Sequence, residues 1–411
     1  MQLLNDDSQR ATFTFPSTGE GSNGISFLND IKVTWSPNVK NLFAILDQKF
    51  DIVNVYHFDS FELQLVGHFK DQLGGICDCW FIGEDNMGLQ CFSIPNRILL
   101  WNINGNLPIR QIDRVICNFE EGIVAFGEEF FILQQRDLSS SFKDAFSFYR
   151  INSALVEVEH LFVTELSNSS SFWRLSQDGT KLFVVGSPFE YRLSAFYLSG
   201  RQAFDFQLKG ETSFVVSFVE ISSLNILILF DSRHRLYAID SQTGALVSFA
   251  PVDILHVSRA NMHPKAQIVH QQHGECITSG EQTEFTLPLP SDSCRRYKMA
   301  LCEGEMLLAF QMDVVSKAVY VFDVHSFTFR SIFLLDGPIL LFEWSRSYKA
   351  LYLIIFTANA VHLWLEGEFF SFSMLSAEQP HELKSIHSIG PFQYCARTVV
   401  GKTLSMRLDN L

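Results

Sequence analysis

A strand-like segment that closes on an aromatic residue recurs about every 40–45 residues along this chain. The segment is seen at Val55–Asp59, Ile98–Asn102, Arg235–Asp240, Val319–Asp323 and Val361–Leu365. A period of this length that ends in an aromatic–Asp or Trp pair is typical of the blades of a WD-type β-propeller. Because each such unit buries its apolar faces only against its neighbours, the pattern predicts one repetitive scaffold instead of a string of unrelated domains.

The repeats divide the chain into seven full units and a partial one. The full units start near Ile31, Gly75, Val115, Ser170, Ser213, Tyr297 and Pro338, and the partial unit runs from about 392 to 409. Short β-branched and aromatic runs alternate with turn signals inside each unit, which predicts an all-β WD40-type propeller of seven or eight blades. We expect residues 1–30 to form an N-terminal segment and residues 31–411 a single propeller. Thr12–Phe15 is the strand expected to pair beside Thr403–Leu408 and close the ring.

Composition narrows the possible partners. The chain has 411 residues, 47% of them hydrophobic and 40 of them phenylalanine, so a large aromatic core is expected. The formal net charge of −14 repels phosphate backbones and anionic lipid, so neither nucleic acid nor membrane is an expected ligand. The eight cysteines lie mostly in apolar, strand-like context and no secretory signal is recognised, which predicts reduced thiols in a cytosolic or nuclear protein.

Two interruptions break the repeat. The first is a polar stretch at 136–146, and the second is a longer insertion at 251–296 between the fifth and sixth units. Loops carry binding more often than scaffolds do, so exposed aromatic and Arg residues here are the expected partner anchors. By composition these are Arg136, Phe142 and Tyr297.

The insertion also holds a group of potential metal ligands. His263, His270, His273 and Cys276 fall within fourteen positions, and His273–Cys276 is spaced like part of a zinc site. The first two histidines are irregularly spaced and no second Cys pair is near, so chance clustering in a polar loop is the favoured interpretation. Cys77 and Cys79 lie two positions apart on an expected strand and point to one face, as core thiols do.

Signals for catalysis are absent. The sequence has no Gly-x-Ser-x-Gly elbow, no His-Glu-x-x-His helix and no phosphate-binding glycine loop, so we expect no catalytic residues, no cofactor and no enzyme activity. Arg295-Arg296 is similar to the paired arginines with which some propellers bind phosphoinositides, but its flanks are Cys294 and Tyr297. A solvated strand terminus is the simpler interpretation.

The blades must cohere mainly by packing. A Gly-His pair occurs only at Gly67-His68 and a Trp-Asp pair nowhere, so the hydrogen-bonded tetrad of WD repeats is largely eroded. The tryptophans expected in the structural core are Trp35, Trp80, Trp101, Trp344 and Trp364.

The order of these degenerate units resembles that of the WD-repeat protein eight family of centrosomes and spindle poles. Similar segments, in the order of that family, are Ile31–Pro37 with Leu42–Leu46, Gly75–Trp80, His263-Pro264, Ser316–Asp323, Leu341–Trp344 and Ala360–Trp364. The chain departs from the family at residues 1–30, which retain little of a further complete repeat. A diverged fungal member is therefore expected.

The resemblance implies a non-enzymatic adaptor at the microtubule-organising centre or spindle pole body. Such an adaptor helps to anchor spindle microtubule minus ends with a coiled-coil anchoring protein and a kinesin-14 motor. An acidic propeller should not bind acidic tubulin by charge, so contact with microtubules is expected to be indirect. The alternatives are a scaffold in another intracellular assembly, such as a ubiquitin ligase or an RNA-processing or translation complex, and a phosphoinositide-binding propeller.

Overall fold

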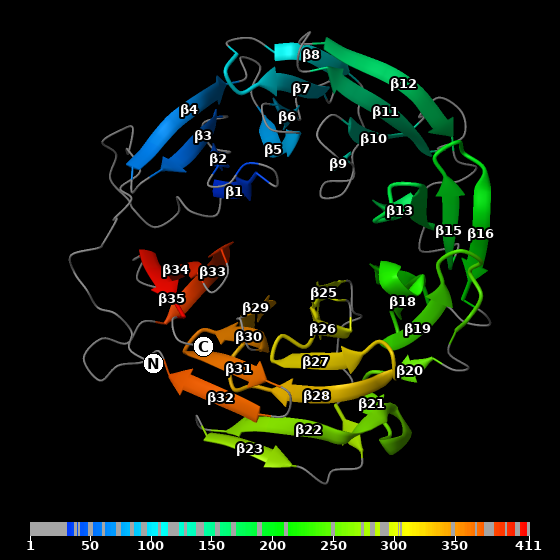
Figure 1. Ribbon diagram of the computed structural model, residues 1–411, viewed down its shortest axis with the longest axis vertical. Helices are drawn as coiled ribbons and strands as arrows, with labels where there is room; N and C mark the ends of the chain where they lie inside the picture. The colour runs from blue at the N-terminus through cyan, green and yellow to red at the C-terminus, as the bar shows by residue number, and fades with distance from the viewer. Residues whose placement is uncertain are drawn as a thin grey trace. The chain divides into compact units, whose positions relative to one another are not determined.

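The computed structural model consists mainly of short antiparallel sheets built from consecutive strands (Figure 1). It describes residues 31–408 apart from 37–38, 40–41, 48–51, 60–61, 71–74, 83–85, 92–96, 106–107, 114–122, 127–129, 137–143, 153–156, 166–169, 187–190, 209–212, 248–250, 273–274, 280–283, 288–295, 303, 305, 347–349, 366–367, 374–381, 391–392 and 399–402. The chain divides into two compact units, one within residues 31–207 and one within residues 208–411.

The first unit contains four four-stranded meanders. In each, the strands pair in sequence order, so every strand lies beside the next one in the chain. Their bounds are β1 (Ile31–Trp35), β2 (Leu42–Asp47), β3 (Ile52–Asp59) and β4 (Glu62–Lys70); β5 (Ile76–Ile82), β6 (Asn86–Cys91), β7 (Arg97–Asn102) and β8 (Pro108–Asp113); β9 (Ile123–Phe126), β10 (Phe130–Arg136), β11 (Asp144–Asn152) and β12 (Glu157–Glu165); and β13 (Ser170–Leu175), β14 (Lys181–Gly186), β15 (Arg192–Tyr197) and β16 (Gln202–Gln207).

The second unit repeats the meander with two variations. Its four-stranded sheets are β17 (Val215–Ile221), β18 (Ile226–Asp231), β19 (Arg235–Asp240) and β20 (Val252–Asp253), and β29 (Ile339–Arg346), β30 (Leu351–Thr357), β31 (Ala360–Leu365) and β32 (Glu368–Ser373). The last described sheet has three strands, β33 (Leu383–Gly390), β34 (Gln393–Thr398) and β35 (Thr403–Arg407).

The insertion at 251–296 is built largely of strands. It contributes β21 (His256–Val257), β22 (Met262–Gln272), β23 (Glu275–Ser279) and β24 (Phe285–Thr286), besides β20. β22 pairs in parallel with β28, so β23 and β22 extend the meander of β25 (Tyr297–Leu301), β26 (Leu307–Met312), β27 (Ala318–Asp323) and β28 (Thr328–Leu334) to six strands. The insertion therefore extends a sheet, and it has more regular structure than a surface loop between two repeats would have.

The described helical residues form two 3-10 turns, at Ser222–Leu224 and Arg259–Asn261. No helix in the described part of the chain has the length and apolar character needed to cross a membrane.

The repeated aromatic–Asp ending marks a tight turn after the third strand of a sheet. Asp240 Oδ1 accepts backbone N–H bonds from Gln242 (2.9 Å) and Thr243 (2.7 Å), and Asp323 Oδ1 accepts from His325 and Ser326 at 3.0 Å each. A carboxylate that accepts two N–H groups of the following turn stabilises the reversal. The recurring Asp therefore ends one strand and starts the turn to the next.

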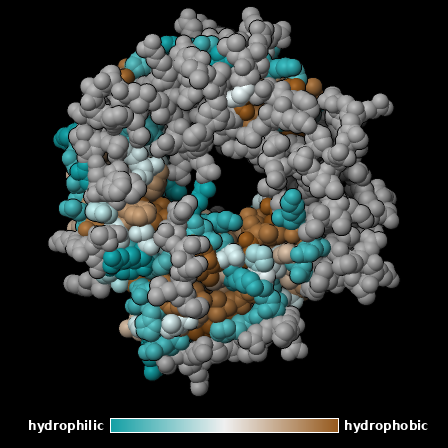
Figure 2. Space-filling model, turned by 180° about the vertical axis from the view of Figure 1, so that it is seen from behind, coloured by the Kyte–Doolittle hydropathy of each residue, from teal (hydrophilic) through white to brown (hydrophobic). Residues whose placement is uncertain are grey.

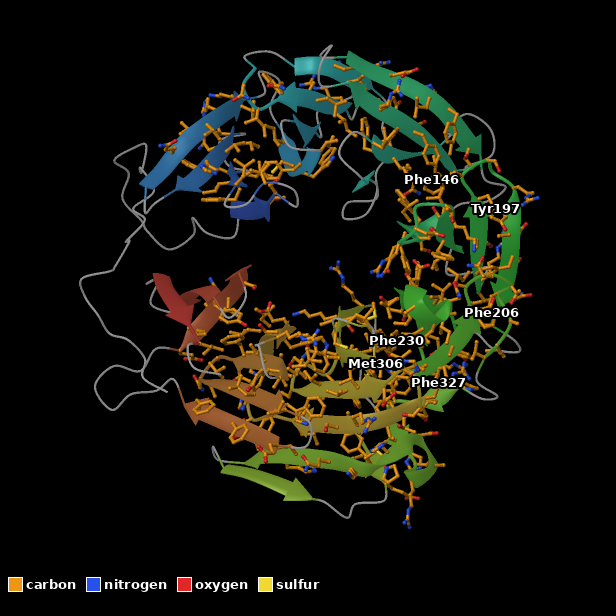
Figure 3. The ribbon with its side chains drawn as sticks, viewed as in Figure 1. Phe146, Tyr197, Phe206, Phe230, Met306 and Phe327 are labelled. Carbon is orange, nitrogen blue, oxygen red and sulfur yellow. The ribbon has the colours of Figure 1, made fainter. Side chains whose placement is uncertain are left out.

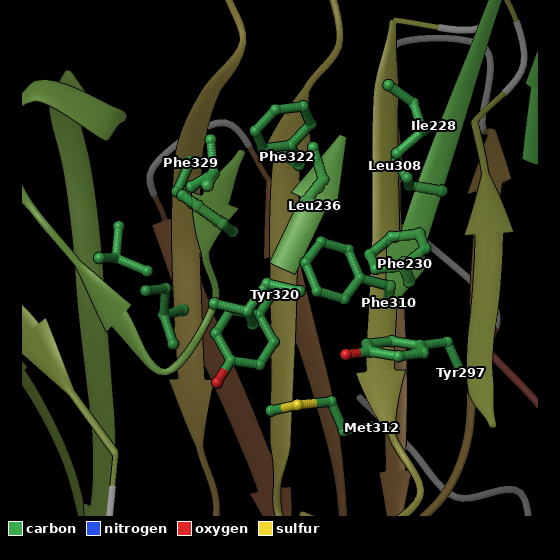
Figure 4. Packing of buried hydrophobic residues seen from close by; sticks show 14 of the residues in the cluster. Ile228, Phe230, Leu236, Tyr297, Leu308, Phe310, Met312, Tyr320, Phe322 and Phe329 are labelled. Carbon is green, nitrogen blue, oxygen red and sulfur yellow. The ribbon is translucent and has the colours of Figure 1, made fainter. Parts of the chain in front are cut away.

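Central strands supply most of the core. β18 and β27 are buried along their whole length, as expected for apolar runs covered on both faces. In the second unit Phe230, Phe310 and Tyr320 lie at the centre of a large aromatic cluster, with Phe310 and Tyr320 stacked at 5.1 Å (Figure 4). The heavy load of phenylalanine thus forms the core, as the composition predicted.

Candidate functional site

Most of the exposed large apolar side chains lie on the last strand of a meander. They are Leu65 on β4, Leu161, Phe162 and Val163 on β12, and Phe370 on β32, together with Leu246 and Val247 in the segment beside β19; Met306 precedes β26. Figure 2 likewise shows brown residues interspersed with teal ones on one face of the molecule. Scattered apolar side chains are ordinary at a protein surface, so only a contiguous group calls for an explanation.

β12 carries such a group. Leu161, Phe162 and Val163 are 36%, 40% and 45% exposed, and residues 159–163 are exposed without interruption. We call residues 159–163 the β12 surface. The corresponding strand β16 behaves differently, because its Phe204 and Phe206 are buried and alternate with exposed polar residues. Sequences that fold well avoid three consecutive exposed apolar residues in a strand unless these residues serve a function.

The β12 surface is held at both of its ends. The Arg110 guanidinium on β8 donates a hydrogen bond to the Val158 carbonyl, and the Thr164 hydroxyl donates one to the Leu198 carbonyl at 2.5 Å. Val158 and Thr164 are themselves buried. The exposed residues therefore span a strand whose termini are fixed by the two neighbouring sheets of the same unit.

Aromatic packing supports the surface from below. The Phe162 ring stacks on the buried Phe148 ring of β11 at 4.3 Å, and the His160 ring packs 5.0 Å from that of Tyr149. Glu159 forms an ion pair with Arg150, Oε2 to Nη2 at 2.5 Å. The two ring contacts hold Phe162 and His160 against β11.

The register of β12 shifts at Leu161. Phe148 pairs with Phe162 while Tyr149 pairs with His160, which leaves Leu161 as an extra residue in the ladder. A bulge of this kind bends the strand and re-aims its side chains. Here it brings Leu161 into the exposed group beside Phe162.

A buried polar network joins the sheet of β12 to the next sheet. Asp144 Oδ2 accepts hydrogen bonds from the Ser170 amide (2.6 Å), the Ser170 hydroxyl (2.5 Å) and Gln134 Nε2 (3.0 Å). The Gln134 carbonyl oxygen accepts from the Trp173 indole at 3.1 Å. This network, which takes the place of the eroded tetrad, could not be predicted, because its members come from three strands and have no common spacing. Figure 3 marks Phe146, which packs against Trp173 at 4.8 Å.

A second network surrounds a buried carboxylate in the other unit. Asp231 accepts the Arg235 guanidinium (Nη2 to Oδ2, 2.8 Å), the Tyr237 hydroxyl (3.1 Å) and the backbone N–H groups of Arg233 and Arg235 (2.9 Å each). Arg235 also donates to the Ser213 hydroxyl at 3.0 Å. Asp231, Arg235 and Tyr237 lie on the neighbouring strands β18 and β19, so this network stabilises the fold.

The predicted core tryptophans have different environments. Trp101 and Trp364 are buried, as predicted, whereas Trp80 and Trp344 are partly buried. The Trp344 indole donates to the Ala300 carbonyl at 2.9 Å, which draws its ring toward the end of β25. The side chain of Trp35 lies outside the described residues. Of the tryptophans whose side chains are described, Trp173 is the most deeply buried, although it was not among those predicted to lie in the core.

The three predicted partner anchors are only partly described. Tyr297 is 4% exposed and stacks on Phe230 at 4.4 Å, so the expectation that it is an exposed anchor is wrong: it belongs to the core. Arg136 ends β10 opposite Asp144, and nothing further is described of its side chain. Phe142 lies outside the described residues.

The potential metal ligands that are described do not all lie together. His263 and His270 lie seven positions apart on β22, a separation of about 20 Å in an extended strand. Cys276 is on β23 opposite Gln271, and His273 lies outside the described residues. The residues described include no group of three or more His, Cys, Asp or Glu placed to hold a metal. His263 and His270 cannot ligate one ion.

His263 has a different contact. Arg330 Nη1 lies 2.9 Å from His263 Nε2, and Arg330 in turn pairs with Asp323 (Nη2 to Oδ2, 2.5 Å). Desolvation and the nearby guanidinium lower the pKa of His263, so the imidazole is neutral at neutral pH. Burial raises the pKa of Asp323, but hydrogen bonds from Ser326 and Arg330 outweigh it and the net shift is downward. The chain from Asp323 through Arg330 to His263 fixes the insertion to its sheet.

The two remaining pairs singled out in the sequence are only partly described. Cys79 is a buried free thiol, as predicted for a core position. Arg296 is exposed just before β25, and Arg295 lies outside the described residues.

Comparison with known proteins identifies the architecture. Neither a protein-family model nor a curated protein sequence matches the chain. Among solved structures it is similar to Saccharomyces cerevisiae Sqt1 (TM-score 0.58, 12% identity, 92% of this chain and 95% of that one), to the C-terminal WD40 domain of Sif2 (0.56, 8%, 93% and 96%) and to BamB from Moraxella catarrhalis (0.52, 10%, 93% and 95%). At these identities the likeness concerns the fold alone. The chain has an all-β, WD40-type propeller fold, in which the meanders are blades.

Proposed function

We propose that this chain is a non-enzymatic protein-binding adaptor. The observation that carries the proposal is the β12 surface, where three consecutive apolar side chains are exposed on a rigid propeller strand. A WD40-type fold is a common scaffold for protein assemblies, and the buried networks around Asp144 and Asp231 serve packing. Binding of another protein is the role that uses the exposed features.

The proposed setting is the microtubule-organising centre or spindle pole body. The chain would help to anchor spindle microtubule minus ends together with a coiled-coil anchoring protein and a kinesin-14. Support comes from the order of the units, which resembles that of the WD-repeat protein eight family from Ile31 to the C-terminus. The insertion with His263-Pro264 falls in the same place in that order.

A closed ring of eight blades is the proposed form of the scaffold. Eight meanders are described, seven of four or more strands and one of three, which ends at β35. The expected closing strand, Thr12–Phe15, lies outside the described residues. Its addition beside β35 would complete the eighth blade and remove a sheet edge.

Because of the negative charge of this chain, we expect the coiled-coil partner to make the contact with microtubules. With a net charge of −14, the chain should be repelled by acidic tubulin. The purified chain is therefore expected to stay in the supernatant when microtubules are sedimented at physiological salt, and to pellet once the coiled-coil partner is added. Pelleting of the chain alone would contradict this division of labour.

Imaging of the tagged chain through mitosis, with identification of the proteins that copurify, tests the proposed setting. Paired foci at the spindle poles and a coiled-coil partner are expected. A diffuse or ribosomal distribution would favour the alternative, a WD40 scaffold of another intracellular complex. Recruitment to phosphoinositide vesicles would favour the membrane-binding alternative.

A further inference from the structure

We propose that the β12 surface binds an extended peptide, with an apolar centre and Lys or Arg at both ends, as a fifth strand of its sheet. The proposal deepens the adaptor function and rests on it, because it names the class of partner segment that the adaptor would hold. It stands on the sheet edge, the exposed side chains and the charges of β12.

The backbone of β12 provides the unpaired strand edge that binding of an extended peptide requires. Among the described strands β12 pairs only with β11, so its other edge forms no ladder. Proteins usually protect such an edge with Pro, Lys or a covering segment, but residues 159–163 contain none of these and are exposed. A free edge binds an extended peptide through main-chain hydrogen bonds, and flanking side chains give specificity.

The same chain shows that the last strand of a meander can accept another strand. β22 of the insertion pairs with β28 through Gln267–Ser331, Ile268–Ile332, Val269–Phe333 and His270–Leu334. β28 is the last strand of its meander, as β12 is of its own. In β28 the added strand comes from the chain itself, whereas the described residues supply none to β12.

Charge selects a partner other than a second copy. The sequence of β12 has three acidic residues, Glu157, Glu159 and Glu165, and no Lys or Arg. Antiparallel self-pairing centred on Leu161 would place Glu157 opposite Glu165, and centring on Phe162 would place Glu159 opposite Glu165. Like charges directly opposite each other destabilise a strand pair, so two copies are disfavoured.

The same charges favour basic residues in the peptide. Arg150 on β11 pairs with Glu159, but this pair is about half exposed and so contributes little. A peptide with Lys or Arg at its ends would meet the acidic ends of β12, while its apolar centre would cover Leu161, Phe162 and Val163. The other exposed apolar positions lack this combination: Phe370 and Leu65, for example, are each the single large apolar side chain exposed among the described side chains of their strand.

Fluorescence anisotropy with a defined peptide tests the proposal. The probe is a labelled peptide of sequence Lys-Lys-Val-Thr-Val-Thr-Val-Lys-Lys, and the protein is the full chain. Binding is expected to weaken at least about tenfold when Glu replaces every Lys of the probe, or when alternate peptide nitrogens are methylated. Hydrogen exchange at residues 159–163 is expected to slow on binding, since the strand edge becomes covered.

Substitutions in the chain localise the contact. Val163→Lys should weaken binding at least about tenfold because it adds a like charge and removes apolar contact, whereas the matched control Phe370→Lys on β32 should not. Unchanged thermal unfolding of both variants establishes that they fold. Absence of binding, equal binding by Val163→Lys, or binding that survives methylation would overturn the proposal. A dimer that dissociates on Val163→Lys would also overturn it, in favour of a second copy.

The two proposals fail separately. If the peptide does not bind but the tagged chain forms spindle-pole foci, only the proposal of peptide binding at the β12 surface is rejected. If the peptide binds but the tagged chain is diffuse in the cell, only the proposed setting at the spindle pole is rejected.

Discussion

Acidification should destabilise the protein through one buried histidine. His362 lies in the middle of β31, is fully buried, and stacks on Phe369 with ring centroids 5.6 Å apart. Neither ring nitrogen has a hydrogen-bond partner among the described residues. Burial lowers the pKa of His362 from 6.5 to about 4, against a small opposing effect of the Asp336 charge.

The sign of the effect follows from the two pKa values. Between pH 6.5 and 4 the unfolded chain binds a proton at this histidine and the folded chain does not, so the free energy of unfolding falls as the pH falls. At pH 5 the loss relative to pH 7.5 is about 2 kcal/mol, since each pKa unit corresponds to about 1.4 kcal/mol. Above pH 6.5 both states are neutral and the contribution is constant.

The perturbation is His362→Leu, which keeps a side chain of similar size and removes the titrating group. Urea unfolding followed by circular dichroism at pH 7.5 and 5.0 gives the pH-dependent loss for each protein. The loss in the variant should be about 2 kcal/mol smaller than in the parent. His256→Gln is the matched control, because His256 is exposed and its ring nitrogen Nδ1 lies 2.8 Å from the Thr286 hydroxyl.

An equal loss in His362→Leu and the parent would refute the reasoning. So would a His362 titration near pH 6.5 in the nuclear magnetic resonance spectrum of the folded protein, because it would mean that the imidazole is solvated. A reduced loss in the His256→Gln control would show that removal of any histidine suffices.

Two further substitutions test the networks. Asp231→Ala should lower the free energy of unfolding by about 3–5 kcal/mol, because Arg235 and Tyr237 would lose a buried acceptor; a loss below 1 kcal/mol in urea unfolding would show that the pair is solvated. Trp344→Ala should cost about 2–3 kcal/mol, less than the 3–5 kcal/mol expected for a fully buried ring, because Trp344 is partly buried and its main polar contact is with the Ala300 carbonyl. Trp344→Phe should recover most of the packing, and a midpoint unaltered by Trp344→Ala would contradict the contact.

The repeat was readable from the sequence because its signals are local. Strands start at Ile31, Ser170 and Tyr297, where the units were predicted to start, and at Ile76, one residue from the predicted position. Period-two patterning and Asp turns act over a few residues, so a single sequence reports them. The predicted start of the third unit, Val115, lies outside the described residues, and the first described strand after it starts at Ile123.

What the sequence did not reveal depends on distant partners. Trp173 on one sheet donates to Gln134 on another, Gln134 in turn donates to Asp144, and no spacing rule connects the three residues. Tyr297 was predicted to be exposed because it borders a polar insertion, yet the aromatic cluster around Phe230 buries it. For the β12 surface a signal was present, since an uninterrupted Leu-Phe-Val between acidic residues does not alternate as a half-buried strand should.

The parallel pairing of β22 with β28 also bears on how the chain folds. β28 follows β22 by about 60 residues, so β22 leaves the ribosome before the strand with which it pairs has been made. Each strand of a meander, in contrast, can pair with the preceding strand as soon as it emerges. Closing the longer loop costs more chain entropy before contacts compensate for it. We expect β22 and β23 to join after the sheet of β25–β28 has formed, which makes the insertion the slow step of its unit and the part that a chaperone would meet exposed.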